Sequence, residues 1–392
     1  MMYQMYREIF RGKPMPFAYV DLDLLDANIQ SILKRAQGTP IRVASKSVRC
    51  TAILKHIFGA STAFQGVMCY SALEAAHLSQ HGFDDLLVAY PCWHEDHVAA
   101  ACELIRAGKS VTLMVDSVEH IRHLDALAAE HGVMLPICLD IDLSIDFPGL
   151  HFGVWRSSIF GVDDALKVYD AAAASSCLRL EGIMGYEAQI AGLGDAGTGL
   201  RNRLIRLLKR RSIPQIVERR KAIVEALQAR GVKLRFVNGG GTGSVESTIQ
   251  EKVVTEVTVG SGFYAPGLFD HYQAFKHQPA AGFAIEIVRQ PKVGIYTCLG
   301  GGYIASGSTD ANKQPVPYLP EGAQLMTLEG AGEVQTPIVY QGAEKLALGD
   351  PIFLRHSKAG ELCERFNSLY LIAQGKIVDQ VPTYRGEGMS FL

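Results

Sequence analysis

The first two thirds of the chain alternate short, β-rich apolar segments with amphipathic helical stretches. An opening strand over 17–22 and a helix over 23–35 precede the main series. Eight further segments are candidate strands, at residues 41–45, 64–69, 85–90, 110–115, 134–139, 178–184, 233–238 and 254–259. Repeated strand and helix units build a parallel sheet covered by helices. Because eight of them fill the usual length of a closed barrel, the pattern predicts an α/β fold with a (β/α)8 TIM barrel.

The last third of the sequence has a different pattern of apolar and turn-forming residues. From about residue 275 it consists of strand-length runs, such as GFAIEIVRQ and SLYLIAQGKIV, separated by Gly, Pro and Asp. Runs of this kind bounded by turn residues are typical of antiparallel strands. We therefore expect two domains, a barrel over 1–275 and a C-terminal antiparallel β domain over 276–392.

Composition narrows the class of partner. The 38 basic and 40 acidic residues give a net charge of −2, so neither nucleic acid nor an anionic membrane surface is an expected partner. No apolar run is long enough to span a bilayer, and the N-terminal stretch is charged where a signal peptide would be apolar. The 8 cysteines form no CxxC pair, which suits reduced thiols. We expect a cytoplasmic protein that binds a small molecule.

Two glycine-rich runs follow the last two candidate barrel strands. These are Gly239-Gly240-Gly241-Thr242-Gly243 and Gly260-Ser261-Gly262. Glycine lets backbone N–H groups approach a ligand closely, and barrel enzymes often bind phosphate in the loops after strands seven and eight. Tight turns also use glycine, but two runs at the two expected loops favour a phosphate site.

A lysine ends the first candidate barrel strand. Lys46 lies between Ser45 and Ser47 after an apolar segment, so it is expected to project into the barrel mouth, where desolvation makes a neutral amine available. The plain alternative is a surface lysine. An inward amine opposite a phosphate site is the combination that holds pyridoxal 5′-phosphate (PLP) as a Schiff base.

These residues match a known family. The chain resembles the fold-type III PLP enzymes, which share an alanine-racemase-like barrel, and within them the D-threonine aldolase and D-serine dehydratase group. The resemblance covers almost the whole chain, and its motifs are RVASK (42–46), SALEAAHLSQHGFDDLLVAYP (71–91), EGIMGYEAQ (181–189), FVNGGGTGS (236–244) and VTVGSGFYAPGLFDHY (257–272).

The resemblance implies a cofactor site. Lys46 would carry the Schiff base, Tyr186 would pack near the pyridine ring, and the two glycine loops would hold the phosphate. The full set that we expect to bind PLP is Lys46, His151, Tyr186, Gly240, Gly241, Thr242, Gly243, Gly260, Ser261, Gly262, Phe263 and Tyr264. His151 stands where relatives place an arginine, so it is either a hydrogen-bond donor to the cofactor or a polar loop residue.

Two further departures concern the catalytic groups. Relatives carry H-x-C, or a carboxylate in place of the cysteine, as ligands of a divalent metal. Here His356, Glu361 and Cys363 are the candidate ligands, which would suit Zn or Mn; the alternative is that no metal binds there. Val48 replaces a histidine of the relatives, and Arg49 either pairs with a substrate carboxylate or forms a structural ion pair.

The sequence therefore predicts a PLP-dependent lyase, an enzyme that cleaves or dehydrates a small D-3-hydroxy amino acid. Lys46, Arg49 and His356 are the candidate catalytic residues, and the resemblance implies a homodimer. An amino-acid racemase on the same scaffold is the nearest alternative. A non-catalytic PLP carrier is the alternative from another class, although the β domain argues against it.

Overall fold

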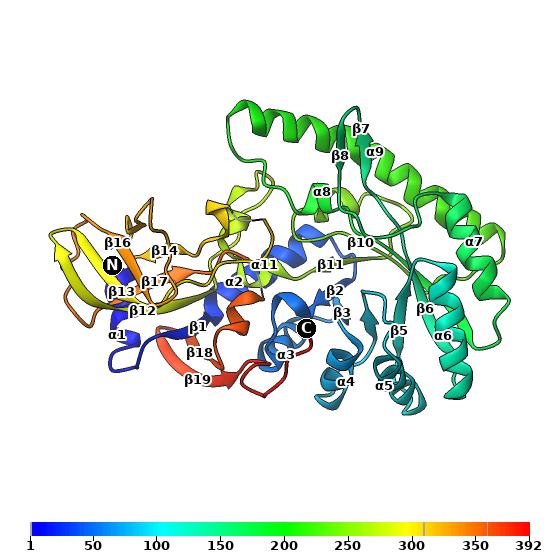
Figure 1. Ribbon diagram of the computed structural model, residues 1–392, viewed down its shortest axis with the longest axis horizontal. Coiled ribbons are helices and arrows are strands. Elements are labelled where there is room, and N and C mark those ends of the chain that lie inside the picture. The colour runs from blue at the N-terminus through cyan, green and yellow to red at the C-terminus, as the bar shows by residue number, and fades with distance from the viewer. Residues whose placement is uncertain (1, 309, 359) are drawn as a thin grey trace.

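A closed barrel of eight parallel strands forms the larger part of the protein (Figure 1). The computed structural model describes residues 2–308, 310–358 and 360–392. Neighbouring strands follow the order β10-β11-β2-β3-β4-β5-β6-β9. Their bounds are β2 Ile41–Ala44, β3 Phe64–Cys69, β4 Leu86–Val88, β5 Val111–Val115, β6 Leu135–Asp140, β9 Leu178–Gly185, β10 Phe236–Gly239 and β11 Glu256–Val259. Each of the eight predicted ranges coincides with one of these strands, which confirms the barrel.

Helices surround the barrel on its outside. They are α2 Leu22–Ala36, α3 Thr51–Ala60, α4 Ala72–Gln80, α5 Glu95–Arg106, α6 Val118–Glu130, α7 Val162–Ala173 and α9 Leu200–Ala229. Three short helices, α8 Ala188–Ala191, α10 Val245–Thr248 and α11 Ser261–Tyr264, lie in the connections that follow β9, β10 and β11. In α2, Leu25, Ile29 and Ile32 are buried on one face, the spacing of an amphipathic helix. The side chains of Ser71 and Ser117 cap α4 and α6 by accepting hydrogen bonds from N–H groups of the first turn.

The longest helix, α9, crosses the top of the molecule in Figure 1. It runs as one element through Pro214 and contains two stretches rich in Arg and Lys, at 201–211 and 217–227. Within the part of the chain that the structure describes, no helix combines the length and the apolar character needed to cross a membrane.

A second, mostly antiparallel sheet of nine strands lies beside the barrel. Its strands are β1 Phe17–Asp21, β12 Ala281–Lys292, β13 Ile295–Leu299, β14 Val316–Leu319, β15 Gln324–Leu325, β16 Gln335–Val339, β17 Pro351–Arg355, β18 Ser368–Ala373 and β19 Lys376–Pro382. The predicted C-terminal β domain is therefore confirmed as an architecture. The boundary at residue 275 stays a prediction.

The opening strand of the sequence belongs to this second sheet. β1 pairs antiparallel with β12 and parallel with β18, so the first strand of the chain is held between two strands from its last third. The preceding helix, α1 Met2–Ile9, buries Tyr6 against the rings of Tyr19 and Phe353 at centroid distances of 5.5 and 5.6 Å. The N-terminal segment thus packs on the β domain.

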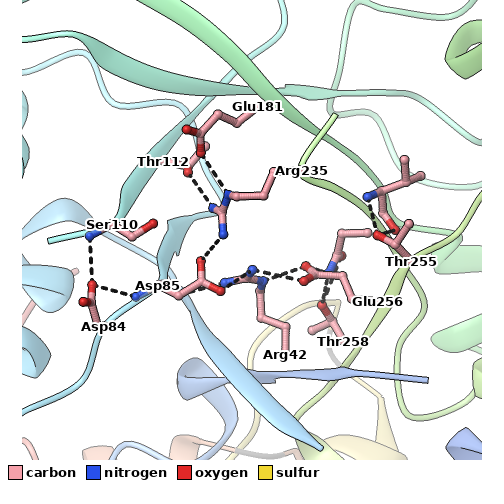
Figure 2. A network of polar contacts seen from close by, with 12 residues as sticks. Arg42, Asp84, Asp85, Ser110, Thr112, Glu181, Arg235, Thr255, Glu256 and Thr258 are labelled. Carbon is pink, nitrogen blue, oxygen red and sulfur yellow. Dashed lines mark hydrogen bonds and ion pairs between the residues drawn. The ribbon is translucent and has the colours of Figure 1, made fainter. Parts of the chain in front are cut away.

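Toward the amino ends of its strands the barrel is filled by ion pairs (Figure 2). Arg42, which is fully buried, donates from Nε to Glu256 at 2.7 Å and from Nη2 to Asp85 at 3.0 Å. Arg235 joins Asp85 to Glu181, with contacts of 2.8 and 3.0 Å. Buried charges are tolerated because each one is paired and hydrogen-bonded. This network closes one end of the barrel, and a cavity occupies the other.

Candidate active site

A cavity of about 1070 Å³, a volume that includes its mouth, lies at the carboxyl ends of the barrel strands. Active sites of these barrels occupy this end, because the loops after the strands converge there. Residues that follow seven of the eight strands line it: Lys46 and Ser47 after β2, Tyr70 after β3, Tyr90 after β4, Asp142 after β6, Tyr186 after β9, Gly240 to Thr242 after β10, and Gly260 and Ser261 after β11.

Lys46 lies in the short helix η1 Ser45–Ser47, directly after β2. Its Nζ donates a hydrogen bond to Tyr90 Oη at 2.9 Å. Burial, the largest single effect, acts to raise the pKa of Tyr90, but the charge and hydrogen bond of Lys46, together with the charge of Arg156, outweigh it and hold the pKa of this phenol below its ordinary value. The contact places a phenol oxygen directly beside the amine in the cavity.

The two glycine loops need glycine for steric reasons at two positions. Gly240 has φ +87°, a left-handed conformation that side chains strain. A Cβ on Gly260 would lie 2.7 Å from Ser47 Oγ and 2.9 Å from Ala44 Cβ. The second loop is therefore packed against the segment that carries Lys46, and the loop backbone itself forms the wall of the cavity.

Contacts between the loops fix their spacing. Thr242 Oγ1 accepts a hydrogen bond from Gly262 N at 3.0 Å, which joins the first loop to the second. Ser47 Oγ lies 3.4 Å from Ser261 Oγ, which joins the second loop to the Lys46 segment. The amine and both loops thus form one connected structure.

Buried ionic side chains brace the first loop from behind. The carboxylate of Glu187, 2% exposed, accepts hydrogen bonds from Gly240 N at 3.1 Å and from Ser244 Oγ at 3.3 Å. Arg220 pairs with Glu187 at 3.2 Å. Arg35 donates to the carbonyl oxygen of Thr242 at 2.6 Å. Because these partners are buried, the loop conformation is set before any ligand binds.

Three side chains around the cavity carry charge or proton-transfer capacity. Arg156 Cζ lies 5.2 Å from the centre of the Tyr186 ring, a cation–π distance. Burial raises the pKa of Tyr186 to about 12, against the opposing charge of Arg156. Burial also raises the pKa of Asp140 to about 7, helped by the nearby Asp116 and Asp142 and opposed by Arg156. Asp140 therefore titrates near neutral pH, as a general acid or base must.

Of the predicted cofactor residues, Lys46, Tyr186, Gly240, Gly241, Thr242, Gly260 and Ser261 line the cavity together. Others support it from outside. Phe263 packs on Phe64, and its carbonyl oxygen accepts a hydrogen bond from Asn28 Nδ2. Gly262 is joined to the cavity by the hydrogen bond that its N–H donates to Thr242. Tyr264 donates to the carbonyl of Val48 at 3.1 Å. A Cβ on Gly243 would meet Ala191 and Tyr272, so this residue packs against the protein.

His151 and Arg49 lie elsewhere. His151 is in β8 Leu150–Phe152, a hairpin strand paired with β7 Ile145–Phe147. Its ring stacks on Trp155 and bonds Asp146 at 2.8 Å. Arg49 donates from Nε to the carbonyl of Lys46 at 3.0 Å and is ion-paired with Glu364. The structure brings neither side chain into the cavity lining.

The predicted metal ligands do not converge. His356 is 3% exposed, its ring nitrogens have no hydrogen-bond partner, and burial followed by the charge of Arg355 lowers its pKa to about 3. Glu361 accepts two hydrogen bonds from Ser306 N, at 3.0 and 3.1 Å. Cys363 Sγ donates to the carbonyl of Val48 at 3.2 Å. Glu361 and Cys363 are thus held by different partners while His356 has none, and the three side chains form no ligand cluster among the described residues.

Sequence reasoning missed Tyr90, Asp140 and Arg156. Tyr90 lies two residues past β4 and Asp140 is the last residue of β6, so both stand at strand ends, where active-site residues of a barrel are expected. Arg156 is the only arginine between β6 and β9. Its being the one arginine in this stretch could have identified it, but the resemblance placed His151, five residues earlier, at the arginine position of the relatives.

A family profile described as the N-terminal domain of alanine racemase matches residues 20–266. The chain belongs to this family. The match confirms the family predicted from the sequence motifs, and because the alanine racemase family is PLP-dependent it supports PLP as the cofactor.

Several characterised proteins resemble this member of the alanine racemase family. A 3-hydroxy-D-aspartate aldolase of Paracoccus denitrificans (strain Pd 1222) is 27% identical over 250 residues, which are 63% of this chain and 59% of the aldolase. The crystal structure of D-threonine aldolase from Filomicrobium marinum has a TM-score of 0.80 at 20% identity, over 95% of both chains. D-threo-3-hydroxyaspartate dehydratase from Delftia sp. HT23 has a TM-score of 0.74 at 20% identity, over 95% of this chain and 98% of the dehydratase. The two structures confirm that the fold extends over both domains.

Proposed function

We propose that the protein is a PLP-dependent lyase that acts at Cα and Cβ of a small D-3-hydroxy amino acid. One observation carries the proposal: the Lys46 amine, the two glycine loops and the Tyr186 ring line the same cavity. The names of the relatives, an aldolase of 3-hydroxy-D-aspartate and a dehydratase of D-threo-3-hydroxyaspartate, support the substrate class.

The residues present fit PLP. A phosphate needs a cradle of backbone N–H groups that side chains do not obstruct, and a Cβ at Gly260 would collide with Ser47 while Gly240 is held at positive φ. Lys46 supplies the amine for covalent attachment, and Thr242 and Ser261 supply hydroxyl groups on the loop side. In place of His151, the guanidinium of Arg156 is the cation available to the cofactor's ring substituents. When bound, PLP withdraws electrons from the bonds at Cα of the substrate.

The protein's own groups then select the reaction. Lys46 Nζ takes or returns a proton at Cα, and Tyr90 Oη, 2.9 Å away, holds the amine in place and shares its proton. Asp140, with a pKa of about 7, is a second group that exchanges protons near neutral pH. Met68, Ala89 and Met184 are an apolar part of the cavity lining, and in this proposal they help to orient the bond to be broken.

The residues predicted as metal ligands do not fit a metal ion, because Glu361 and Cys363 are held by different partners and the three side chains form no ligand cluster in the described structure. No step of the proposal depends on a metal at these residues. Activation of the substrate hydroxyl is assigned to the proton-transfer groups in the cavity.

The experiment is an assay of the purified holoenzyme on D-threonine, D-serine and the isomers of 3-hydroxyaspartate, each with and without Mn²⁺ or Zn²⁺. The products measured are aldehyde, keto acid and the opposite enantiomer. Aldehyde with glycine, or glyoxylate with glycine, identifies an aldolase, and keto acid with ammonia identifies a dehydratase. Formation of the enantiomer alone would show a racemase and overturn the proposal. Lys46→Ala is the control for each product.

The proposal includes a homodimer, in which the β domain of one subunit completes the barrel mouth of the other, as the resemblance implies. It also places the protein in the cytoplasm, where its 8 unpaired cysteines stay reduced. Sedimentation of the holoenzyme tests the dimer. A fully active monomer at assay concentration would contradict it.

A further inference from the structure

A cluster of two histidines and a glutamate lies outside the cavity. His77 is on α4, His81 is the residue that ends it, and Glu387 comes from the turn after β19. One ligand atom from each lies within 4.8 Å of the other two, and no other trio of His, Cys, Asp or Glu side chains in residues 2–308, 310–358 and 360–392 does so. The cluster joins the barrel wall to the C-terminal segment.

The helix positions the two imidazoles. Residues four apart in an α-helix share one face, and the rings of His77 and His81 are 4.6 Å apart at 61°. His77 is 6% exposed, and its Nε2 lies 3.1 Å from Glu387 Oε2. The His77 Nε2 therefore faces the Glu387 carboxylate, and imidazole nitrogen and carboxylate oxygen are both ligands that Zn²⁺ takes in proteins.

A tight turn presents the carboxylate. Glu387 N donates to the carbonyls of Thr383 and Tyr384 at 3.0 and 3.1 Å, and Met389 N returns to Tyr384 at 2.8 Å. Tyr384 is anchored in turn, because its Oη donates to the buried Glu74 at 3.0 Å and its ring packs edge-on against His77 at 5.4 Å. The buried Tyr384 therefore holds both sides of the cluster: its ring contacts His77, and its carbonyl oxygen accepts the backbone hydrogen bonds of the turn that carries Glu387.

We propose that His77, His81 and Glu387 bind Zn²⁺ and thereby clamp the C-terminal segment 383–392 onto α4. Tetrahedral Zn²⁺ with nitrogen and oxygen ligands at about 2.0–2.2 Å keeps ligand atoms roughly 3.3–3.6 Å apart. The His77–Glu387 distance of 3.1 Å is close to this, and rotation of the half-exposed His81 ring completes the set. Three protein ligands leave the fourth position to water.

The clamp has a consequence for the neighbouring cavity. Phe391 packs on His77 at 5.6 Å and on Tyr70 at 6.2 Å. Phe391 and Leu392 line a second pocket whose wall also includes Lys46 and Tyr90. A metal ion on Glu387 therefore orders the segment that forms one side of the space next to the Lys46 amine.

The test measures Zn²⁺ binding to the metal-stripped, PLP-loaded protein by competition with a chromophoric chelator. His81→Gln and Glu387→Gln are the variants, since both residues are partly exposed and both changes keep size and polarity. His56→Gln is the matched control, because His56 on α3 is paired only with Asp26 at 2.6 Å. We expect each variant to bind one equivalent of Zn²⁺ more than about 100-fold more weakly than the wild type, because loss of even a residue that only hydrogen-bonds a metal ligand costs 10–100-fold in affinity. The His56→Gln control should bind Zn²⁺ as the wild type does.

A second readout tests the clamp itself. Zn²⁺ should slow hydrogen exchange of residues 383–392 in the wild type and in His56→Gln, but not in the two variants. Wild-type binding that survives both substitutions would overturn the site, and so would the absence of Zn²⁺ binding at micromolar concentration. Unchanged exchange in zinc-loaded wild type would overturn the clamp. Neither readout measures turnover, so failure of the proposed lyase activity is a separate outcome.

Discussion

The contact between Lys46 Nζ and Tyr90 Oη is the most informative single interaction in the cavity. Tyr90→Phe removes the hydroxyl and leaves the ring that lies beside the amine. We expect the holoenzyme to keep its cofactor but to lose about 100-fold in kcat, the range in which one proton-transfer group contributes. Steady-state kinetics and the cofactor absorption spectrum measure both effects. Tyr169→Phe on α7 is the control, and an unchanged kcat in Tyr90→Phe would remove Tyr90 from the proposed proton path.

Glu74 makes stability depend on pH. It is fully buried, it accepts hydrogen bonds from Tyr70 N and Tyr384 Oη, and burial raises its pKa to about 7 against the opposing hydrogen bonds and Arg49. Between its ordinary pKa and about 7 the folded protein holds a proton that the unfolded chain has lost. The free energy of unfolding therefore falls as pH rises through this window.

The Glu74→Gln variant has no carboxyl group to titrate at this position, so it lacks this pH dependence. Relative to the wild type, the variant should gain stability between pH 5 and pH 8 by roughly 1–3 kcal/mol, because one unit of pKa shift corresponds to about 1.4 kcal/mol. Urea unfolding at the two pH values measures the difference. If the gap between the two proteins is the same at pH 5 and pH 8, Glu74 is ionised in the folded state throughout and the linkage is wrong.

At the scale of elements, the prediction that PLP binds in the cavity depends most on the glycine loop after β10. Gly240→Ala places a Cβ at φ +87°, which strains the backbone by about 1–3 kcal/mol, and shifts the loop that faces Lys46. We expect at least tenfold weaker PLP binding and lower stability. Gly38→Ala is a matched control, since Gly38 has the same φ but no atom within 4 Å of the added methyl group.

In this comparison both variants should lose stability, while only Gly240→Ala should lose cofactor affinity in a PLP titration followed by fluorescence. Equal affinity in the two would show that the loop does not hold the cofactor. The result separates backbone strain from a role in binding.

The elements show what sequence reasoning can and cannot reach. The eight barrel strands followed from apolar periodicity, because each is a buried local segment with turns on both sides. Lys46 and the two glycine loops followed from their place just after such strands. The position of Arg156 did not, since it depends on how the β7–β8 hairpin turns the chain before α7. The expected metal site also depended on side-chain directions, and Glu361 turns to Ser306.

At the scale of the whole molecule, the chain's first residues pack on the second sheet, which is built mostly from its last third. Phe10 is 4% exposed and its ring contacts Phe17 of β1, Phe353 of β17 and Tyr370 of β18, at centroid distances of 4.4, 6.0 and 6.0 Å. Sequence periodicity could not assign β1 to the second sheet, because its strand partners lie more than 260 residues away. We propose that residues 2–21 fold with the C-terminal domain.

Phe10→Ala tests this assignment. Truncating a buried phenylalanine costs about 3–5 kcal/mol, and hydrogen exchange should show the loss of protection first in β12, β17 and β18. Phe64→Ala, which acts inside the barrel beside Phe263, should expose the barrel strands first. Loss of protection in the barrel before the second sheet in Phe10→Ala would contradict the assignment.

The central claim is that Lys46 holds PLP across the cavity from the two glycine loops. Borohydride reduction of the holoenzyme, followed by proteolysis and mass spectrometry, fixes the cofactor to the lysine that carries it. The account predicts one phosphopyridoxyl group per chain, on the peptide that contains Lys46, and none in Lys46→Ala. A label on another lysine, or no label on a protein that retains full activity, would contradict it.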